Sequence, residues 1–174
     1  MKPLFAATVA LALAVSGTAS ADQRSSHPGV GELASFQFAH GSAALDPNHD
    51  GAPNTDLGQI AGWIEEHPDG LIVLDGHADP TGPNNVNLRL SFARAKAVRE
   101  ELMNLGVDPD HIVIAAFGEG GPQSTRDRRV VAWGTRAGMK AVVARTRAIG
   151  PSIISTGLLS ELEMHPQPGA VARR

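Results

Sequence analysis

Cysteine is absent from this chain of 174 residues. Its absence excludes a disulfide framework, a thiolate metal site and a lipid attached through an N-terminal cysteine. Long apolar runs are also absent after residue 21, whereas a helix that crosses a bilayer needs about 20 consecutive, mostly apolar residues. We therefore expect the chain after residue 21 to form a single domain without covalent cross-links.

Positive charge is scarce in the body of the chain and collects near its end. Residues 22–134 hold 8 Lys and Arg against 16 Asp and Glu, a net charge of −8, whereas residues 135–174 hold 6 against 2, a net charge of +4. The acidic body argues against nucleic acid as a partner, because phosphate binding needs a basic surface. The basic end is expected either to meet an anionic surface or, more simply, to lie against the acidic body.

The first 21 residues predict a signal peptide. Lys2 provides a positive start, residues 4–15 are apolar, and the small residues Ala19-Ser-Ala21 form a cleavage site before Asp22. The apolar stretch is too short to span a bilayer, which argues against an uncleaved anchor. We therefore expect an exported chain that begins at Asp22 with a flexible lead-in over residues 22–32.

Apolar periodicity and turn residues predict an alternating order of strands and helices. The short apolar run at residues 71–74 is typical of a buried strand, and Gly106 is typical of a helix end. The predicted strands are 33–39, 71–75, 111–117 and 128–133, and the predicted helices are 55–68 and 85–105. The order β-α-β-α-β-β predicts an α+β fold, a two-layer sandwich with the helices on one face of a mixed sheet.

Residues 135–174 form a basic C-terminal extension whose structure the sequence leaves open. Over 139–149, the valine pair at 142–143 favours a strand, whereas the neighbouring alanines favour a helix. The apolar pairs at 153–154 and 158–159 indicate that part of the extension is packed rather than loose.

A polar loop and the helix after it carry the most informative pattern in the chain. The loop follows the strand that ends at Asp75 and contains Asp79 and the turn residues Pro80 and Gly82. Six residues then recur at intervals of three and four, so they share one face of the helix. These residues are Asn87, Leu90, Ser91, Arg94, Ala95 and Val98.

This ordered pattern resembles the signature of the OmpA-like domain of the OmpA/MotB/Pal family, which binds peptidoglycan. The matching motifs are Asp79-x-x-Gly82, Asn87-x-x-Leu90-Ser91, Arg94-Ala95 and Val98, with Phe36-x-Phe38, Ser42 and Leu45 upstream and Gly106, Gly118-Glu119 and Arg128-Arg129-Val130 downstream. The resemblance covers residues 33–134 and implies the OmpA-like form of the predicted sandwich. No motif of this family covers the extension.

The resemblance implies that Asp79 and Arg94 grip diaminopimelate, an amino acid of many Gram-negative stem peptides. Its side chain ends in an ammonium and a carboxylate on one carbon. An arginine suits the carboxylate because its guanidinium donates two parallel hydrogen bonds, and an aspartate suits the ammonium as a short acceptor. Asp79 and Arg94 occupy the two positions that the family uses for this purpose.

The same resemblance implies supporting roles for neighbouring residues. Asn87 is expected to hold the loop or to touch the ligand, and Thr81 and Gly82 are expected to shape the loop and to offer backbone N–H groups. One arginine of the pair at 128–129 is expected to line the far wall, and Arg129 is our candidate.

Two other interpretations of these residues stay open. Asp79 and Arg94 would also suit a plain salt bridge between loop and helix, since ion pairs are often structural. His77 would suit a metal site shared with Asp79, or a base acting on Ser91, as in a cell-wall hydrolase. A single histidine without a partner cluster is more often structural.

The predicted function is that of a non-catalytic periplasmic protein that binds the stem peptides of peptidoglycan non-covalently through diaminopimelate. No cofactor or metal is expected. The first alternative is an envelope subunit with a degenerate site that binds a partner protein, and the second is a cell-wall hydrolase. A further hypothesis assigns to the basic extension an outer-membrane or other envelope protein as partner.

Overall fold

The computed structural model describes residues 31–45, 53–120, 128–150, 152–157 and 163–164. The predicted signal peptide, the lead-in up to residue 30, the apolar pair at 158–159 and the end of the chain lie outside the described residues. Across the described part of the chain, no helix has both the length and the apolar character that a membrane crossing requires.

Six strands of the described residues form one mixed sheet in the order β1-β4-β2-β3-β5-β6. β2 and β3 run parallel, and the other neighbouring pairs run antiparallel. The strands are β1 (Gly31–Gln37), β2 (Leu71–His77), β3 (Ile112–Gly118), β4 (Arg129–Thr135), β5 (Ile153–Thr156) and β6 (Glu163–Met164). A short 3₁₀ helix, η1 (Pro109–His111), leads into β3.

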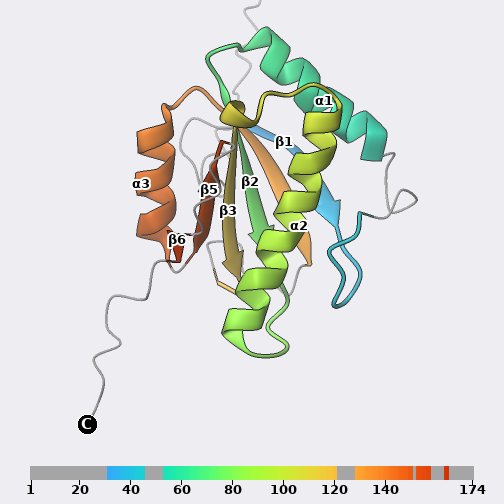
Figure 1. The fold of residues 1–174 in the computed structure, drawn as a ribbon, viewed down its shortest axis with the longest axis vertical. Coiled ribbons are helices and arrows are strands. Elements are labelled where there is room, and N and C mark those ends of the chain that lie inside the picture. Colours follow the sequence, from blue (N-terminus) through green and yellow to red (C-terminus); the bar gives the residue numbers. More distant parts are fainter. Residues whose placement is uncertain (1–30, 46–52, 121–127, 151, 158–162, 165–174) are drawn as a thin grey trace, which may run out of the picture.

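Helices pack on both faces of this sheet, so the fold has three layers (Figure 1). α1 (Pro53–Glu66) and α2 (Asn84–Asn104) cover one face, and α3 (Met139–Ile149) covers the other. Alternate residues of β2 therefore enter two cores, because successive side chains of a strand point to opposite faces. Ile72 and Leu74 join the core beneath α1 and α2, whereas Leu71 and Val73 join the core beneath α3.

The α+β class and the β-α-β-α-β-β order through residue 134 are confirmed. The expectation that helices lie on one face only was incomplete, because α3 adds a layer on the second face. Every residue of β2 and of β3 is buried, as is typical of strands covered on both sides. Residues 139–149 are helical, which settles the two options left open for them.

Part of the basic extension is integral to the fold. β5 pairs with β3, and its Ile153 and Ile154 are buried in the two opposite cores. Arg99 of α2, itself 8% exposed, donates a hydrogen bond to the carbonyl of Gly157 just after β5. Its burial lowers the pKa of this arginine, and nearby acidic charges oppose that shift. Helix, sheet edge and extension are thus fastened together.

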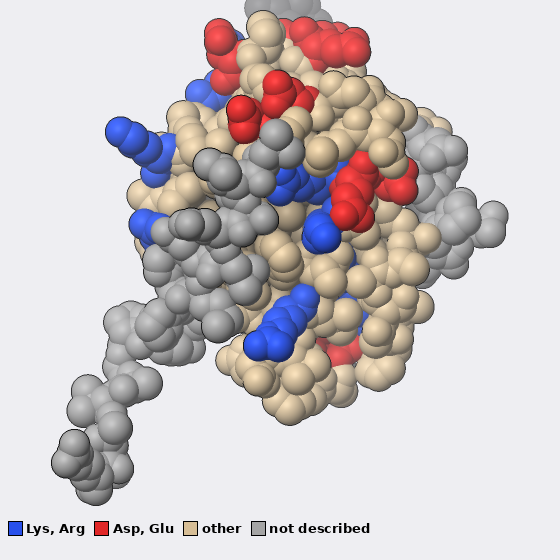
Figure 2. Space-filling view, viewed as in Figure 1, with Lys and Arg blue, Asp and Glu red and all other residues tan. Residues whose placement is uncertain are grey.

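The exposed side of α3 and the segment just before it carry much of the extension's positive charge. Between Thr135 and Gly150 the chain holds four basic residues and no acidic one. All four are exposed to solvent, and they are Arg136, Lys140, Arg145 and Arg147. Figure 2 shows basic side chains projecting from the side of the molecule on which α3 lies. The buried face of α3, including Val142 and Thr146, packs against the sheet.

Two contacts set the position of α2 against the ends of β2 and β3. Gly76 faces the carbonyl of Ser91, and a side chain at residue 76 would collide with that backbone atom. The Ser91 hydroxyl accepts a hydrogen bond from the N–H of Gly118 (2.9 Å) and donates one to the carbonyl of Leu88 (2.8 Å). The helix face that carries the sequence motif therefore lies directly over the strand ends.

Candidate functional site

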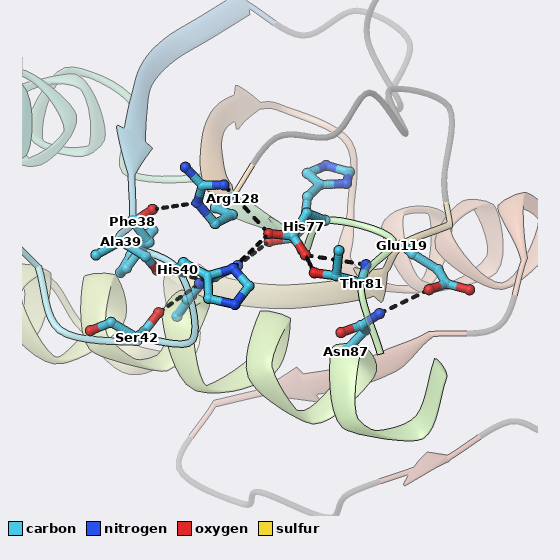
Figure 3. A network of polar contacts seen from close by, with 11 residues as sticks. Phe38, Ala39, His40, Ser42, His77, Thr81, Asn87, Glu119 and Arg128 are labelled. Atoms are coloured by element: carbon cyan, nitrogen blue, oxygen red, sulfur yellow. Dashed lines mark hydrogen bonds and ion pairs between the residues drawn. The ribbon is translucent and has the colours of Figure 1, made fainter. Parts of the chain in front are cut away.

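The motif residues meet where β2 and β3 end and β4 begins. The N–H of Ala78 donates to the carbonyl of Gly118 (2.7 Å), which ties the loop after β2 to the end of β3. The N–H of Phe38 donates to the carbonyl of Arg128 (2.7 Å), and Nε of Arg128 donates to the carbonyl of Phe38 (3.1 Å). The loop after β2 is therefore fastened to the end of β3, and the loop after β1 to the start of β4 (Figure 3).

Asp79 lies in the loop after β2, and its side chain is 14% exposed. Its Oδ1 accepts hydrogen bonds from the N–H (3.2 Å) and the hydroxyl of Thr81. Its Oδ2 lies 3.5 Å from Nη1 of Arg128 and 3.4 Å from Nδ1 of His40. Figure 3 shows these three side chains converging on one carboxylate.

The hydrogen-bond donors around Asp79 favour its charged form. The pKa of Asp79 is lowered to about 2, first by the Thr81 hydroxyl and then by the Thr81 N–H, His40 and Arg128, while burial acts in the opposite direction. Hydrogen bonds that a carboxylate accepts stabilise the anion relative to the acid. Asp79 is therefore a fixed negative charge at neutral pH.

Arg94 projects from α2 beneath the loop after β1 and is fully buried. It donates to three carbonyls, from Nε to Ser42 (2.8 Å), from Nη1 to His77 (3.0 Å) and from Nη2 to Ala39 (3.2 Å). Its guanidinium carbon also lies 5.5 Å from the ring centre of Phe38, within the range of a cation–π contact. Arg94 thus joins the loop after β1 to the end of β2 through one cation.

Burial lowers the pKa of Arg94, and the charge of Asp79 raises it again. A guanidinium carries five N–H groups, so the three bonds leave two N–H groups without a bond among the described residues. The plain salt bridge considered between Asp79 and Arg94 is not what the structure shows. In the described part of the chain, Asp79 pairs with Arg128 and His40 instead.

Asn87 and Gly82 support the loop from the N-terminal end of α2. Asn87 is 3% exposed, and its Nδ2 donates to Oε2 of Glu119 (2.8 Å) in the segment after β3. Gly82 has a φ of 102°, a conformation that side-chain-bearing residues rarely adopt. Asn87 therefore joins the segment after β3 to α2, and Gly82 allows the sharp turn that brings Asp79 back over the strand end.

Of the two candidate arginines, the structure brings Arg128 to the site. Arg129 is the first residue of β4, and by the alternation of the strand it shares a face with Val131 and Trp133, which belong to the core beneath α3. Val130 belongs to the opposite core, beneath α1 and α2. That alternation is a signal in the sequence that would have favoured Arg128 over Arg129.

His77 does not join Asp79 in a metal site. Its side chain is 3% exposed and stacks on Phe117 of β3, with ring centres 5.8 Å apart. The ring points away from Thr81 and Asn87 (Figure 3). Ser91 lies on the other face of the sheet, where its hydroxyl bonds to Gly118 and Leu88. Across the described residues, no group of three potential His, Cys, Asp or Glu ligands comes together.

Sequence reasoning did not identify His40. Its side chain is 74% exposed, and it approaches Asp79 from a loop 39 positions earlier in the chain. No motif marks it. The sequence does place it between Phe38 and Ser42, two residues that match the upstream part of the family pattern, so its loop was expected near the site.

Comparison with known proteins gives matches over the same part of the chain. A sequence model described as OmpA family matches residues 37–132. The peptidoglycan-binding protein ArfA of Mycobacterium tuberculosis is 33% identical over 85 residues, which is 49% of this chain and 25% of that protein. The peptidoglycan-associated lipoprotein of Mesorhizobium japonicum is 33% identical over 73 residues, covering 42% and 44%.

Among solved structures, the C-terminal domain of Helicobacter pylori MotB superposes with a TM-score of 0.51 at 20% sequence identity, covering 67% of this chain and 94% of that domain. At this identity the likeness concerns the fold alone. The matched segment spans less than half the length of both sequence relatives.

Proposed function

Since this chain belongs to the OmpA family, we propose that it binds peptidoglycan non-covalently and that diaminopimelate of the stem peptide is the group it grips. The observation that carries the proposal is that a fixed anion and a fixed cation lie near the end of one strand, β2. Asp79 and Arg94 come from adjacent elements, and each is held in place by several hydrogen bonds. A zwitterionic side chain offers one charge to each.

The ammonium of the ligand would bind at Oδ2 of Asp79. Oδ1 is already used by the N–H and the hydroxyl of Thr81, whereas Oδ2 faces Arg128 and His40, whose side chains are 41% and 74% exposed. These two side chains can move aside into solvent. Charge-assisted hydrogen bonds are about twice as strong as neutral ones, so an ammonium is a good substitute for either of them.

The carboxylate of the ligand would receive the remaining N–H groups of Arg94. Because Arg94 is fully buried, the loop carbonyls of Ala39 and Ser42 must shift for a carboxylate to reach it. Arg94 therefore has two roles in the proposal, since it supports the loop in the unliganded protein and binds the ligand after the loop has moved. Arg128, at the rim, is a second cation within reach of the ligand.

The relatives support the coarse form of this proposal. One is named as a peptidoglycan-binding protein and another as a peptidoglycan-associated lipoprotein. We accordingly propose that the protein lies in the periplasm, in contact with peptidoglycan, and we assign it no catalytic step.

Two exposed charged residues outside the site, Asp69 and Arg89, provide matched controls for variants of the site.

Co-sedimentation with purified sacculi that contain diaminopimelate tests the proposal. The parent protein should pellet with the sacculi, Asp79→Asn should stay largely in the supernatant, and the control Asp69→Asn should pellet like the parent. Arg94→Lys keeps the charge but not the planar set of donors, so it should bind weakly, whereas Arg89→Lys should not differ from the parent. A folded parent that stays in the supernatant would overturn the proposal and favour a partner-binding subunit.

Two further arms test specificity and chemistry. Sacculi that carry lysine in place of diaminopimelate lack the side-chain carboxylate, so they should retain much less protein. Equal retention would contradict recognition through diaminopimelate while leaving peptidoglycan binding intact. Release of soluble muropeptides from the sacculi by the parent, but not by Asp79→Asn, would instead indicate a hydrolase.

A further inference from the structure

The carboxylate of Asp79 presents two unequal oxygens to its surroundings. Oδ1 is engaged inside the loop by the N–H and the hydroxyl of Thr81, neither of which changes charge. Oδ2 is the oxygen that faces outward, and in the unliganded protein it is shared by Nη1 of Arg128 at 3.5 Å and Nδ1 of His40 at 3.4 Å. A cationic ligand group that binds Asp79 must compete with these two side chains.

His40 is held near Asp79 by the loop that carries it. Arg94 donates to the carbonyls of Ala39 and Ser42, the residues on either side of the His40–Gly41 turn. The imidazole itself is 74% exposed and packs into no core. The loop therefore fixes where the ring sits, while the ring remains in contact with solvent protons.

The geometry also defines which atom of His40 carries a hydrogen. A carboxylate oxygen accepts hydrogen bonds and cannot donate them, so Nδ1 of His40 must be the donor in its contact with Asp79. That condition is met by one neutral tautomer and by the imidazolium. Among the described residues, the charged groups near the ring are Asp79 on the loop after β2 and Arg128 before β4, and Arg94 lies beneath the loop that carries the ring.

We propose that His40 competes with the ligand's ammonium for Oδ2 of Asp79, so that protonation of His40 weakens binding to peptidoglycan. The inference rests on the proposed function. The imidazolium offers Asp79 a charged donor in place of a neutral one, and it adds a positive charge beside an incoming ammonium. Arginine side chains keep their charge over the range of about pH 5 to pH 8 in which histidine side chains change theirs. The two competitors are therefore expected to respond differently to pH.

The expected effect is modest because the pair is exposed. Exposed ion pairs contribute about 0.2–1 kcal/mol, which corresponds to a change in affinity of roughly 1.4- to 5-fold at 1.4 kcal/mol per factor of ten. The acidic groups of peptidoglycan are carboxylates with pKa values near 4, so they stay charged over the same range. The change should therefore come from the protein.

Sacculus co-sedimentation at about pH 8 and about pH 5.5, at constant ionic strength, tests the inference over the range in which histidine titrates. The parent should bind roughly 1.4- to 5-fold more weakly at the lower pH. His40→Gln keeps a neutral donor and should bind equally at both values. His40→Lys carries a permanent charge and should bind weakly at both. The exposed position of residue 40 makes loss of folding unexpected, and circular dichroism checks it.

The outcomes separate this inference from the proposed function. If the parent binds with equal affinity at both pH values, or if His40→Gln keeps the parent's pH dependence, His40 is not the competitor and the inference is wrong, although the proposed function stands. If the folded parent does not bind sacculi at either pH, both fail.

Discussion

Replacement of Arg94 by Ala should lower the free energy of unfolding by about 1.5–4 kcal/mol. Arg94 donates to three carbonyls, and those of Ala39 and Ser42 lie on a partly exposed loop where water can replace the lost donor. The carbonyl of His77 is in a buried contact. Leaving one buried acceptor without a donor costs about 1–3 kcal/mol, and loss of the cation–π contact with Phe38 adds about 0.5–1 kcal/mol.

Urea unfolding followed by tryptophan fluorescence measures this loss, because Trp63 packs against one core and Trp133 lies in the other. The variant should remain folded in buffer, since small domains have about 5–15 kcal/mol of stability, but its midpoint should move to lower urea. Arg89→Ala, an exposed position on the same helix, serves as the control. An unfolding free energy within about 0.5 kcal/mol of the parent's would refute the view that Arg94 supports the loops.

Three other changes have defined expected results. Ser91→Ala removes the acceptor of the buried Gly118 N–H and should cost about 1–3 kcal/mol in urea unfolding. Acidification should remove the stabilisation that Asp79 provides as the pH falls from about 4 toward 2, because its pKa is lowered to about 2; a pH titration of stability should show that Asp79→Asn lacks this component. Deletion of residues 136–174 removes buried Val142, Ile153 and Ile154. Burial of each of these side chains contributes about 1.5–3 kcal/mol to stability, so the truncated protein should be unfolded. Circular dichroism measures this, and a folded product would refute the assignment of α3 and β5 to the core.

Short apolar runs and periodic segments made most of the fold predictable from the sequence. The apolar runs predicted β2 and β3, and residues that recur at intervals of three and four on one face predicted α2. The same runs also held information that we did not use. An uninterrupted apolar run in a strand is typical of a strand that is covered on both faces. The runs at residues 71–74 and 112–117 therefore required cover on the second face, and α3 is the segment that provides it.

The arrangement of the candidate site was predictable where its residues belong to one local pattern and not where they come from distant loops. Asp79, Asn87 and Arg94 follow one another along a single loop and helix, and the structure brings them to one strand end. The ring of His40 and the carbonyls that Arg94 holds depend on the path of the loop after β1. Periodicity within an element does not determine that path, because contacts between distant segments fix it.

Asp79 and Arg94, the two central residues of the proposed site, differ in burial, so variants at these two positions test different properties of the protein. Asp79 is at the rim, and its local partner Thr81 is two positions away, so replacing it changes the charge of the site without removing a contact between the layers. Arg94 is fully buried and joins β2 to the loop after β1. An Arg94 variant can therefore lose binding because the ligand contact is gone or because the loop has lost its support, and a stability measurement separates these two causes. Loss of binding in Asp79→Asn at unchanged neutral-pH secondary structure points to the ligand contact itself, and for that reason Asp79 is the residue on which the proposed function should be judged.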